Sequence, residues 1–125
     1  MRILLDTHTL IWWFEGSGRL LPSTVEMIAD AQATVVVSVA TVWEIEIKRA
    51  LGTMTAPDDV LAQVAANAFD LLPISGEHAV AAARLPRHHD DPFDRLLIAQ
   101  AMAEGLTAVS REKRFADYGV RLIYS

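Results

Sequence analysis

The sequence predicts an α/β domain in which a central, mostly parallel sheet of four to five strands lies between two layers of helices. Short apolar runs typical of buried strands recur along the chain, and segments with helical start and stop signals separate them. At 125 residues the chain has the usual length of one domain. We therefore expect residues 1–125 to form a single domain in which strands and helices alternate.

The first half of the chain predicts two strands and three helices. The strands are the short apolar run Ile3-Leu4-Leu5 and the β-branched run from Thr34 to Ser38. Signals at helix ends are the glycines of Gly16-Ser17-Gly18, Pro22 at a helix start and Gly52 as a C-cap. The helices are expected from Thr9 to Glu15, from Pro22 to about Ala31 and from about Ala40 to Leu51.

The second half continues the alternation with three strands, three helices and a helical turn. Asp58 is a candidate N-cap, Ser75 begins a helix with His78, and Asp91-Pro92 opens the helix with the strongest signals. The helices are expected from Asp58 to Ala68, from Ser75 to before Pro86 and from Asp91 to Glu104, with a turn from Glu112 to Ala116. The strands are expected at Phe69 to Ile74, Thr107 to Val109 and Val120 to Tyr124.

Four acidic residues lie where these elements approach the carboxyl edge of the sheet. Asp6 ends the first strand, Glu44 lies in the helix after the second, Asp94 lies in the first turn of its helix, and Glu112 follows the fourth strand. Ligands of such sheets bind outside the carboxyl ends of the strands. We therefore expect the four carboxylates to meet in one site.

The chemistry of such a site favours a hard divalent cation. Carboxylates at close quarters repel one another unless a cation intervenes, and an all-oxygen site suits Mg²⁺ or Mn²⁺. A bound ion of this kind supplies an activated water and neutralises charge on a phosphate. The pattern therefore predicts a magnesium-dependent nuclease with Asp6, Glu44 and Asp94 as catalytic acids and Glu112 as a further metal ligand, reached through a water or as an outer ligand.

Each acid also has a purely structural interpretation. Asp6 could cap the helix that follows, Glu44 could pair with Lys48, Asp94 could belong to a helix start with Asp91 as N-cap, and Glu112 could begin a short helix. Further side chains could contact a substrate. These candidates are Thr7, Ser38, Lys48, Arg95, Ser110 and Arg111. The aromatic run of Trp12, Trp13 and Phe14 is more typical of a core or a partner contact than of base stacking.

Composition limits the remaining function classes. The chain has no cysteine, which excludes disulfides, thiolate zinc sites and a cysteine nucleophile and suits the cytoplasm. No apolar stretch approaches a membrane span, so we expect no membrane partner. The formal charge of −5 taken alone argues against nucleic acid, but four carboxylates at a metal site would account for most of it.

Four segments of the chain resemble the PIN-domain ribonucleases, and among them most closely the VapC-type toxins of bacterial toxin–antitoxin pairs. The segments are LLDTHTLIWW, SVATVWEIEIKRALG, HDDPFDRLLIAQA and AVSREKRF, and the resemblance runs from Ile3 to the C-terminus. It implies a three-layer, Rossmann-like PIN fold with an acidic Mg²⁺ or Mn²⁺ site at Asp6, Glu44 and Asp94. The family usually has a fourth acid, an Asp, where this chain has Glu112 after Ser110 and Arg111.

The resemblance also implies what the protein acts on and binds. It implies an endoribonuclease with RNA as substrate, a homodimer, and inhibition by a cognate antitoxin protein. Two other classes stay open. One is a non-catalytic binding module that kept the PIN fold. The other is an aspartate-dependent phosphoryl-transfer enzyme, for which Asp6-Thr7-His8-Thr9 lacks a second Asp at position 8.

Overall fold

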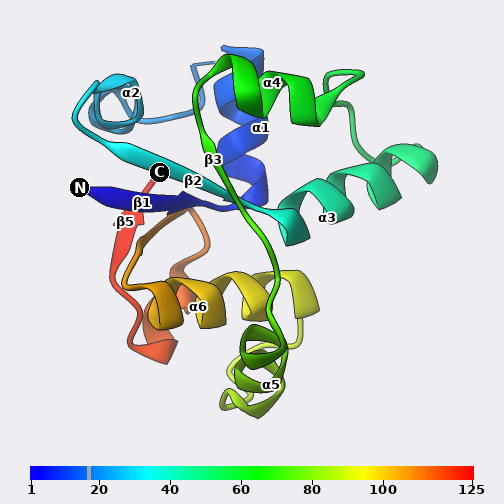
Figure 1. Ribbon diagram of the computed structural model, residues 1–125, viewed down its shortest axis with the longest axis vertical. Helices are drawn as coiled ribbons and strands as arrows, with labels where there is room; N and C mark the ends of the chain where they lie inside the picture. The colour runs from blue at the N-terminus through cyan, green and yellow to red at the C-terminus, as the bar shows by residue number, and fades with distance from the viewer. Residues whose placement is uncertain (17) are drawn as a thin grey trace.

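A computed structural model describes residues 1–16 and 18–125 of the chain; Ser17, part of the predicted stop of the first helix, lies outside them. Five strands form one sheet in the order β3-β2-β1-β4-β5, and every neighbouring pair is parallel (Figure 1). The strands are β1 (Arg2–Leu5), β2 (Thr34–Ser38), β3 (Asp70–Leu72), β4 (Thr107–Ser110) and β5 (Leu122–Tyr124). The predicted α/β class with a parallel sheet is confirmed.

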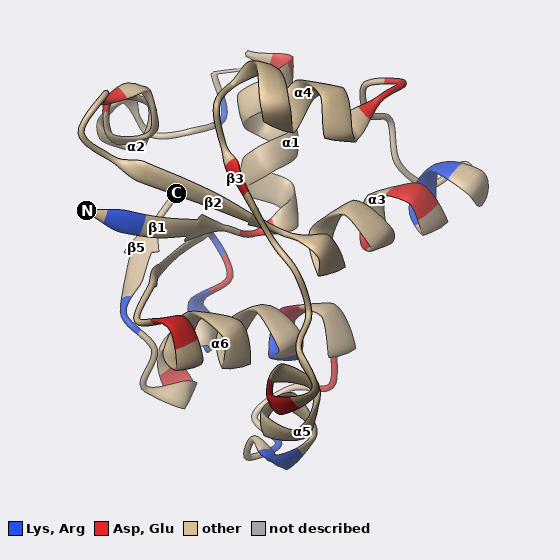
Figure 2. Cartoon of the chain, viewed as in Figure 1, with Lys and Arg blue, Asp and Glu red and all other residues tan. Residues whose placement is uncertain are grey.

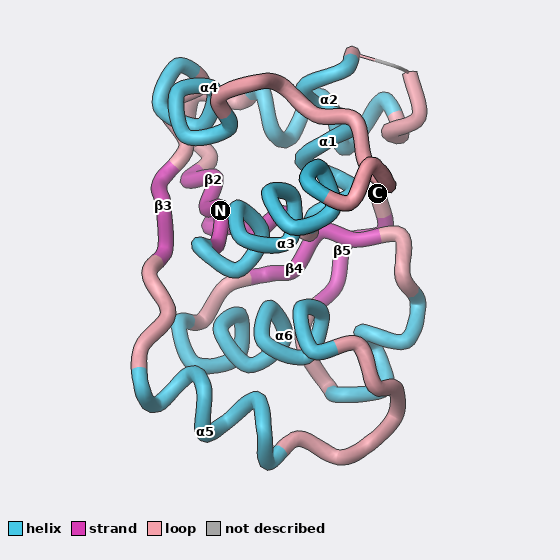
Figure 3. Tube along the Cα trace, turned by 90° about the vertical axis from the view of Figure 1, so that its right-hand side faces the viewer, coloured by secondary structure: helices cyan, strands magenta, loops and turns pink. Residues whose placement is uncertain are grey.

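Helices cover both faces of this sheet. They are α1 (Thr7–Glu15), α2 (Pro22–Ala29), α3 (Val39–Ala50), α4 (Val60–Ala66), α5 (Gly76–Arg84), α6 (Pro92–Glu104) and the 3₁₀ helix η1 (Lys113–Tyr118). Figures 1 and 3 show α1, α2 and α4 on one side of the strands and α5 and α6 on the other, with α5 packed on the outside of α6. Helix α3 leaves β2 at the carboxyl edge and extends away from the sheet (Figure 1). No helix in the described part of the chain is long and apolar enough to cross a membrane.

The alternation of side chains along the strands builds one core on each face. On β1, Ile3 and Leu5 pack toward α1, α2 and α4, whereas Leu4 packs toward α6. Leu4 lies beside Val36 of β2 in the register, and both belong to the core under α6. Because both faces of the central strands are buried, those strands read as continuous apolar runs in the sequence.

The best-predicted helix is α6, whose bounds agree with the prediction at both ends. Asp91 is its N-cap and accepts hydrogen bonds from the backbone N–H groups of Phe93 and Asp94. Gly105 ends the helix in the left-handed conformation at φ 66°, where a side chain would be strained. This fixes the position of Asp94 in the first turn, close to the carboxyl edge of the sheet.

Several predicted boundaries were wrong by one or two residues. Helix α1 begins at Thr7 rather than Thr9, because Asp6 is extended and its side chain accepts from the N–H of Thr9. The N-cap of α4 is Asp59 rather than Asp58, and the helix ends at Ala66. Two further elements are shorter than predicted, namely α2, which ends at Ala29, and β5, which begins at Leu122. Helix α3 keeps its predicted length but is shifted by one residue to Val39–Ala50.

Strand β3 is also shorter than predicted, at Asp70–Leu72 instead of Phe69 to Ile74. Pro73 has no N–H to donate to a neighbouring strand and ends the pairing. At the other end, the N–H of Phe69 donates to the carbonyl of Val64 and so closes α4 rather than extending the strand.

Candidate active site

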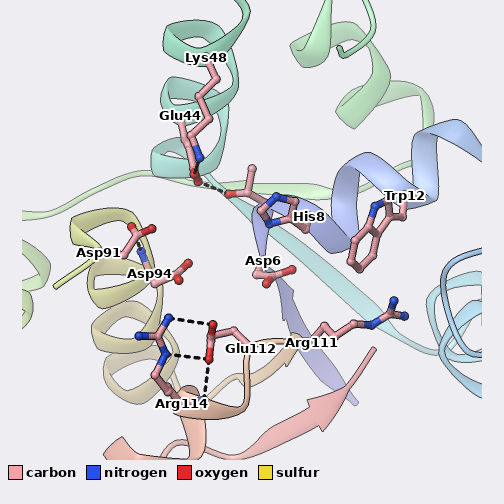
Figure 4. A pocket seen from close by; sticks show the side chains of 11 residues that line it. Asp6, His8, Trp12, Glu44, Lys48, Asp91, Asp94, Arg111, Glu112 and Arg114 are labelled. Carbon is pink, nitrogen blue, oxygen red and sulfur yellow. Dashed lines mark hydrogen bonds and ion pairs between the residues drawn. The ribbon is translucent and has the colours of Figure 1, made fainter. Parts of the chain in front are cut away.

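The predicted acids line one cavity at the carboxyl edge of the sheet. The cavity has a volume of about 400 Å³. Its lining residues are Asp6, Thr7, His8, Trp12, Glu44, Lys48, Asp91, Asp94, Arg111, Glu112 and Arg114. Figure 2 shows Asp and Glu at the end of β1, along α3 and at the N-terminal end of α6, and Figure 4 shows the side chains around the cavity. Segments far apart in the sequence thus contribute carboxylates to one place.

Asp6 lies at the bottom of this arrangement, where β1 passes into α1. Its backbone N–H donates to the carbonyl of Val109, and one carboxylate oxygen caps α1 through Thr9 at 2.9 Å. The other oxygen accepts from the Ser110 hydroxyl at 2.6 Å. Burial raises the pKa of Asp6 above its ordinary value, although the hydrogen bonds from Ser110 and Thr9 oppose the shift. Asp6 therefore combines the capping role with a position in the cavity.

Glu44 is buried on α3 and is held by two donors. The Thr7 hydroxyl donates to Oε1 at 2.5 Å, and the ammonium of Lys48 lies 2.6 Å from Oε2. Lys48 is one turn further along α3, and its raised pKa is due first to this hydrogen bond with Glu44. The pair with Lys48 expected from the sequence exists, and it lies inside the cavity rather than on a remote surface.

Asp94 is half-buried in the first turn of α6 and faces the other acids. Burial is the main cause that raises its pKa to about 7, followed by the charges of Asp91, Asp6, Glu44 and Glu112. A carboxylate that is this hard to ionise favours a positively charged ligand. Asp94 is therefore, like Asp6, a candidate in the cavity for binding a cation.

Glu112, like Glu44, is held by a cation of the protein. Its carboxylate receives two hydrogen bonds from the guanidinium of Arg114, at 3.0 and 3.1 Å, and caps η1 through the Arg114 N–H (Figure 4). These bonds lower the pKa of Glu112 to about 2. The structural interpretation of Glu112 as a helix start is therefore correct, and any role at a metal must compete with Arg114.

Three of the candidate substrate residues do line the cavity, namely Thr7, Lys48 and Arg111. The other three are corrections. Ser38 is buried, caps α3 and donates to Gln100 at 2.5 Å, so it faces the core under α6.

Arg95, the second of these residues, is buried. Its guanidinium donates to the backbone carbonyls of Ala82, Leu85 and Pro86, and so holds the end of α5 against α6. Ser110 is buried, donates to Asp6 and accepts from the N–H of Glu112, which leaves it to position Asp6 rather than contact a substrate.

Sequence reasoning missed His8 as a lining residue and assigned Asp91 only as a cap. His8 is exposed and lies two residues after Asp6. The sequence signal that could have identified it is its position in the first helical turn after the end of a strand. Asp91 is the N-cap as interpreted, yet it also lines the cavity.

A divalent ion fits this cavity as a hydrated ion. No group of three acidic or histidine residues in the described part of the chain converges closely enough to form a ready-made metal site. Asp6 and Asp94, however, present carboxylate oxygens whose ionisation burial disfavours. Mg²⁺ is commonly held by one or two carboxylates while it keeps several waters, and this donor set suits it.

Fold and cavity together define the class of three-layer α/β proteins that gather carboxylates at the carboxyl edge of a parallel sheet. Within this class the model of the PIN domain family matches residues 3–120. The chain therefore belongs to the PIN domain family. A comparison with curated proteins gives no match.

Several solved structures share the fold at low sequence identity. VapBC2 from Rickettsia felis, bound to a DNA fragment from its promoter, has a TM-score of 0.72 and 15% identity, covering 99% of this chain and 98% of that chain. DNA-bound VapBC from Salmonella typhimurium has a TM-score of 0.71 and 18% identity, covering 99% and 98%. VapBC-5 from Mycobacterium tuberculosis, of the VapBC family of toxin–antitoxin systems, has a TM-score of 0.57 and 21% identity, covering 98% and 96%.

Proposed function

We propose that the protein is a metal-dependent endoribonuclease and the VapC-type toxin of a toxin–antitoxin pair. The observation that carries the proposal is the cavity that Asp6, Glu44 and Asp94 line together, with the pKa of Asp94 raised to about 7 by burial and by the charges of its neighbours. Membership of the PIN family and the likeness in fold to toxin–antitoxin complexes support it. The homodimer remains a prediction from the resemblance, and the cytoplasmic location remains a prediction from the absence of cysteine.

In this proposal Asp6 and Asp94 hold Mg²⁺ or Mn²⁺, and Glu44 contributes from α3. When bound, such an ion supplies Lewis acidity toward a phosphate and lowers the pKa of a bound water. Ser110 and Thr9 fix the Asp6 carboxylate, and Thr7 fixes that of Glu44. Lys48 lies on the cavity wall, where its ammonium can hold a phosphate oxygen of the RNA backbone.

The decisive experiment is incubation of the purified protein with an RNA pool and a matched DNA pool, with Mg²⁺ and with EDTA, followed by mapping of the cut sites. Cleavage of RNA that requires the metal is the expected result. Phosphoryl transfer to the protein without strand cleavage would favour the aspartate-dependent enzyme, and binding without either reaction would favour the non-catalytic module.

Glu112 gives a graded test of the same site. We expect Glu112→Gln to raise the Mg²⁺ concentration for half-maximal cleavage by about tenfold, as for an acid that orients a metal-bound water. Glutamine still accepts the N–H of Arg114, so η1 should remain capped. Lys113→Gln, an exposed neighbour outside the cavity, is the control. An unaltered half-saturation would restrict Glu112 to its capping role.

An apolar groove lies beside the acidic cavity. It has a volume of about 360 Å³. Its lining residues are Trp12, Trp13, Gly16, Gly18, Leu20 and Val25, and Trp12 lines both the groove and the acidic cavity. We propose that a helix of the antitoxin lies in the groove and that an arginine from it pairs with the carboxylates.

Val25→Glu tests the groove without touching the acids. We expect it to weaken copurification with the small inhibitory protein of the native host by at least about tenfold, because a charge would enter an apolar contact. Metal-dependent RNA cleavage should be unchanged. Val80→Glu on α5 is the matched control, since both valines are exposed on helices. Equal binding by both variants would place the antitoxin elsewhere.

A further inference from the structure

One wall of the acidic cavity is a column of three side chains in contact, Arg111, Trp12 and His8, in which the two rings are tilted against each other. The guanidinium of Arg111 lies over the Trp12 ring, 4.5 Å from its centroid, and the His8 ring lies 5.8 Å from Trp12 at an interplanar angle of 38°. All three side chains line the cavity that holds Asp6 and Asp94. Figure 4 shows His8 and Trp12 on α1 and Arg111 after β4, on the side of the cavity away from Asp91 and Asp94.

The column is anchored at one end and open at the other. Arg111 is half-buried, and its guanidinium donates to the backbone carbonyl of Ser125 at 2.9 Å and to that of Arg19. Trp12 is half-buried and packs against the core under α1. His8 is exposed. A planar group entering the cavity therefore meets the exposed His8 ring at the free end of this column.

The chemistry of this end suits a nucleobase. A base stacks on aromatic faces without regard to its identity, and a cation behind the ring strengthens the stack. Such a column next to carboxylates, with Lys48 on another wall, brings a stacking surface and a phosphate-binding charge into one cavity. A packing contact alone would not require an exposed ring inside the cavity.

We propose that His8, Trp12 and Arg111 bind one unpaired nucleobase of the RNA, next to the phosphate that is cleaved at the carboxylates. This inference rests on the proposed function and adds a base-binding subsite to it; a paired base is stacked within its own duplex and cannot reach His8. His8 is the residue that contacts the base, Trp12 supports it, and Arg111 holds Trp12 in place.

Binding measurements separate this role from catalysis. In an Asp94→Asn background, which removes cleavage, fluorescence anisotropy gives the Kd for a short single-stranded RNA and for copies with one abasic nucleotide at each position in turn. We expect His8→Ala to weaken binding of the intact RNA about tenfold and to leave binding of one abasic copy unchanged, because both changes remove the same stack. His8→Phe should retain tight binding.

His88→Ala is the matched control, because His88 is also an exposed histidine whose ring contacts an aromatic side chain, but it lies outside the cavity lining. The inference would be overturned if His8→Ala weakened binding of the intact RNA and of every abasic copy equally, or if it had no effect on binding. A loss confined to antitoxin binding would also overturn it and would assign the column to the protein partner. If binding depended on the base but the protein without the Asp94→Asn substitution never cleaved RNA, the proposed function would be overturned and this inference would stand.

Discussion

RNA cleavage is expected to fall roughly a thousandfold when Asp94 or Asp6 is replaced by asparagine, because a metal ion contributes several kcal/mol to stabilising a phosphoryl transition state. Asparagine keeps the size of each side chain but removes the negative charge that attracts the ion. At position 6 it can still accept the N–H of Thr9, so α1 should remain capped. Cleavage rates in Mg²⁺, with circular dichroism to verify folding, measure the effect.

Asp90→Asn is the control for this pair of substitutions. Asp90 is an exposed acid just before α6, where it pairs with Arg87, and it lies outside the cavity lining. Its replacement changes the net charge by the same amount and should leave the rate unaltered. Wild-type rates in the Asp6 and Asp94 variants, or undiminished cleavage in EDTA, would exclude a carboxylate-held ion from the reaction.

The sequence predicted those parts of the fold whose signals are local. Asp91-Pro92 and Gly105 determine the ends of α6 through capping and a left-handed backbone, and both effects depend only on neighbouring residues. The start of α1 was missed because it depends on the extended backbone of Asp6, which pairing of β1 with β4 sets. Local chemistry therefore predicts helix ends better than it predicts where a strand stops.

The candidate site was predictable in its acids but not in its other members. The rule that sites lie at the carboxyl edge of a parallel sheet is enough to group Asp6, Glu44 and Asp94. Whether Arg95 faces the cavity or the interior depends on how α5 packs against α6, which no short segment encodes. The same holds for Ser38, whose partner Gln100 is 62 residues away in the sequence.

The metal-free protein should become more stable at neutral pH when Asp94 is replaced by asparagine. The pKa of Asp94 is about 7 in the folded chain against an ordinary value of 3.8, so the folded state binds the proton more tightly than the unfolded state. The free energy of unfolding therefore falls as the pH rises from about 4 to about 7, and this loss is complete above that window. The raised pKa of Asp6 acts in the same direction.

Asp94→Asn removes this loss, so at about pH 8 without metal the variant should melt several degrees above the wild type, at roughly 3–6 °C for each kcal/mol in a domain of this size. At about pH 3 the two should melt almost together, since Asp94 is then mostly protonated in both the folded and the unfolded state. Glu112 acts in a separate window, because its lowered pKa of about 2 withdraws stability only as the pH falls below its ordinary value of 4.5.

Magnesium should reverse the order of the two proteins. An ion that binds only the folded state raises stability by mass action, so the wild type should gain stability with rising Mg²⁺ while Asp94→Asn gains little. Melting curves at about pH 8 in Mg²⁺ and in NaCl of equal ionic strength separate specific binding from screening. Asp90→Asn should follow the wild type in every condition. A variant at Asp94 that melts below the wild type without metal would show that burial and the neighbouring carboxylates do not destabilise the ionised Asp94. A variant that responds to Mg²⁺ as the wild type does would show that Asp94 does not hold the ion.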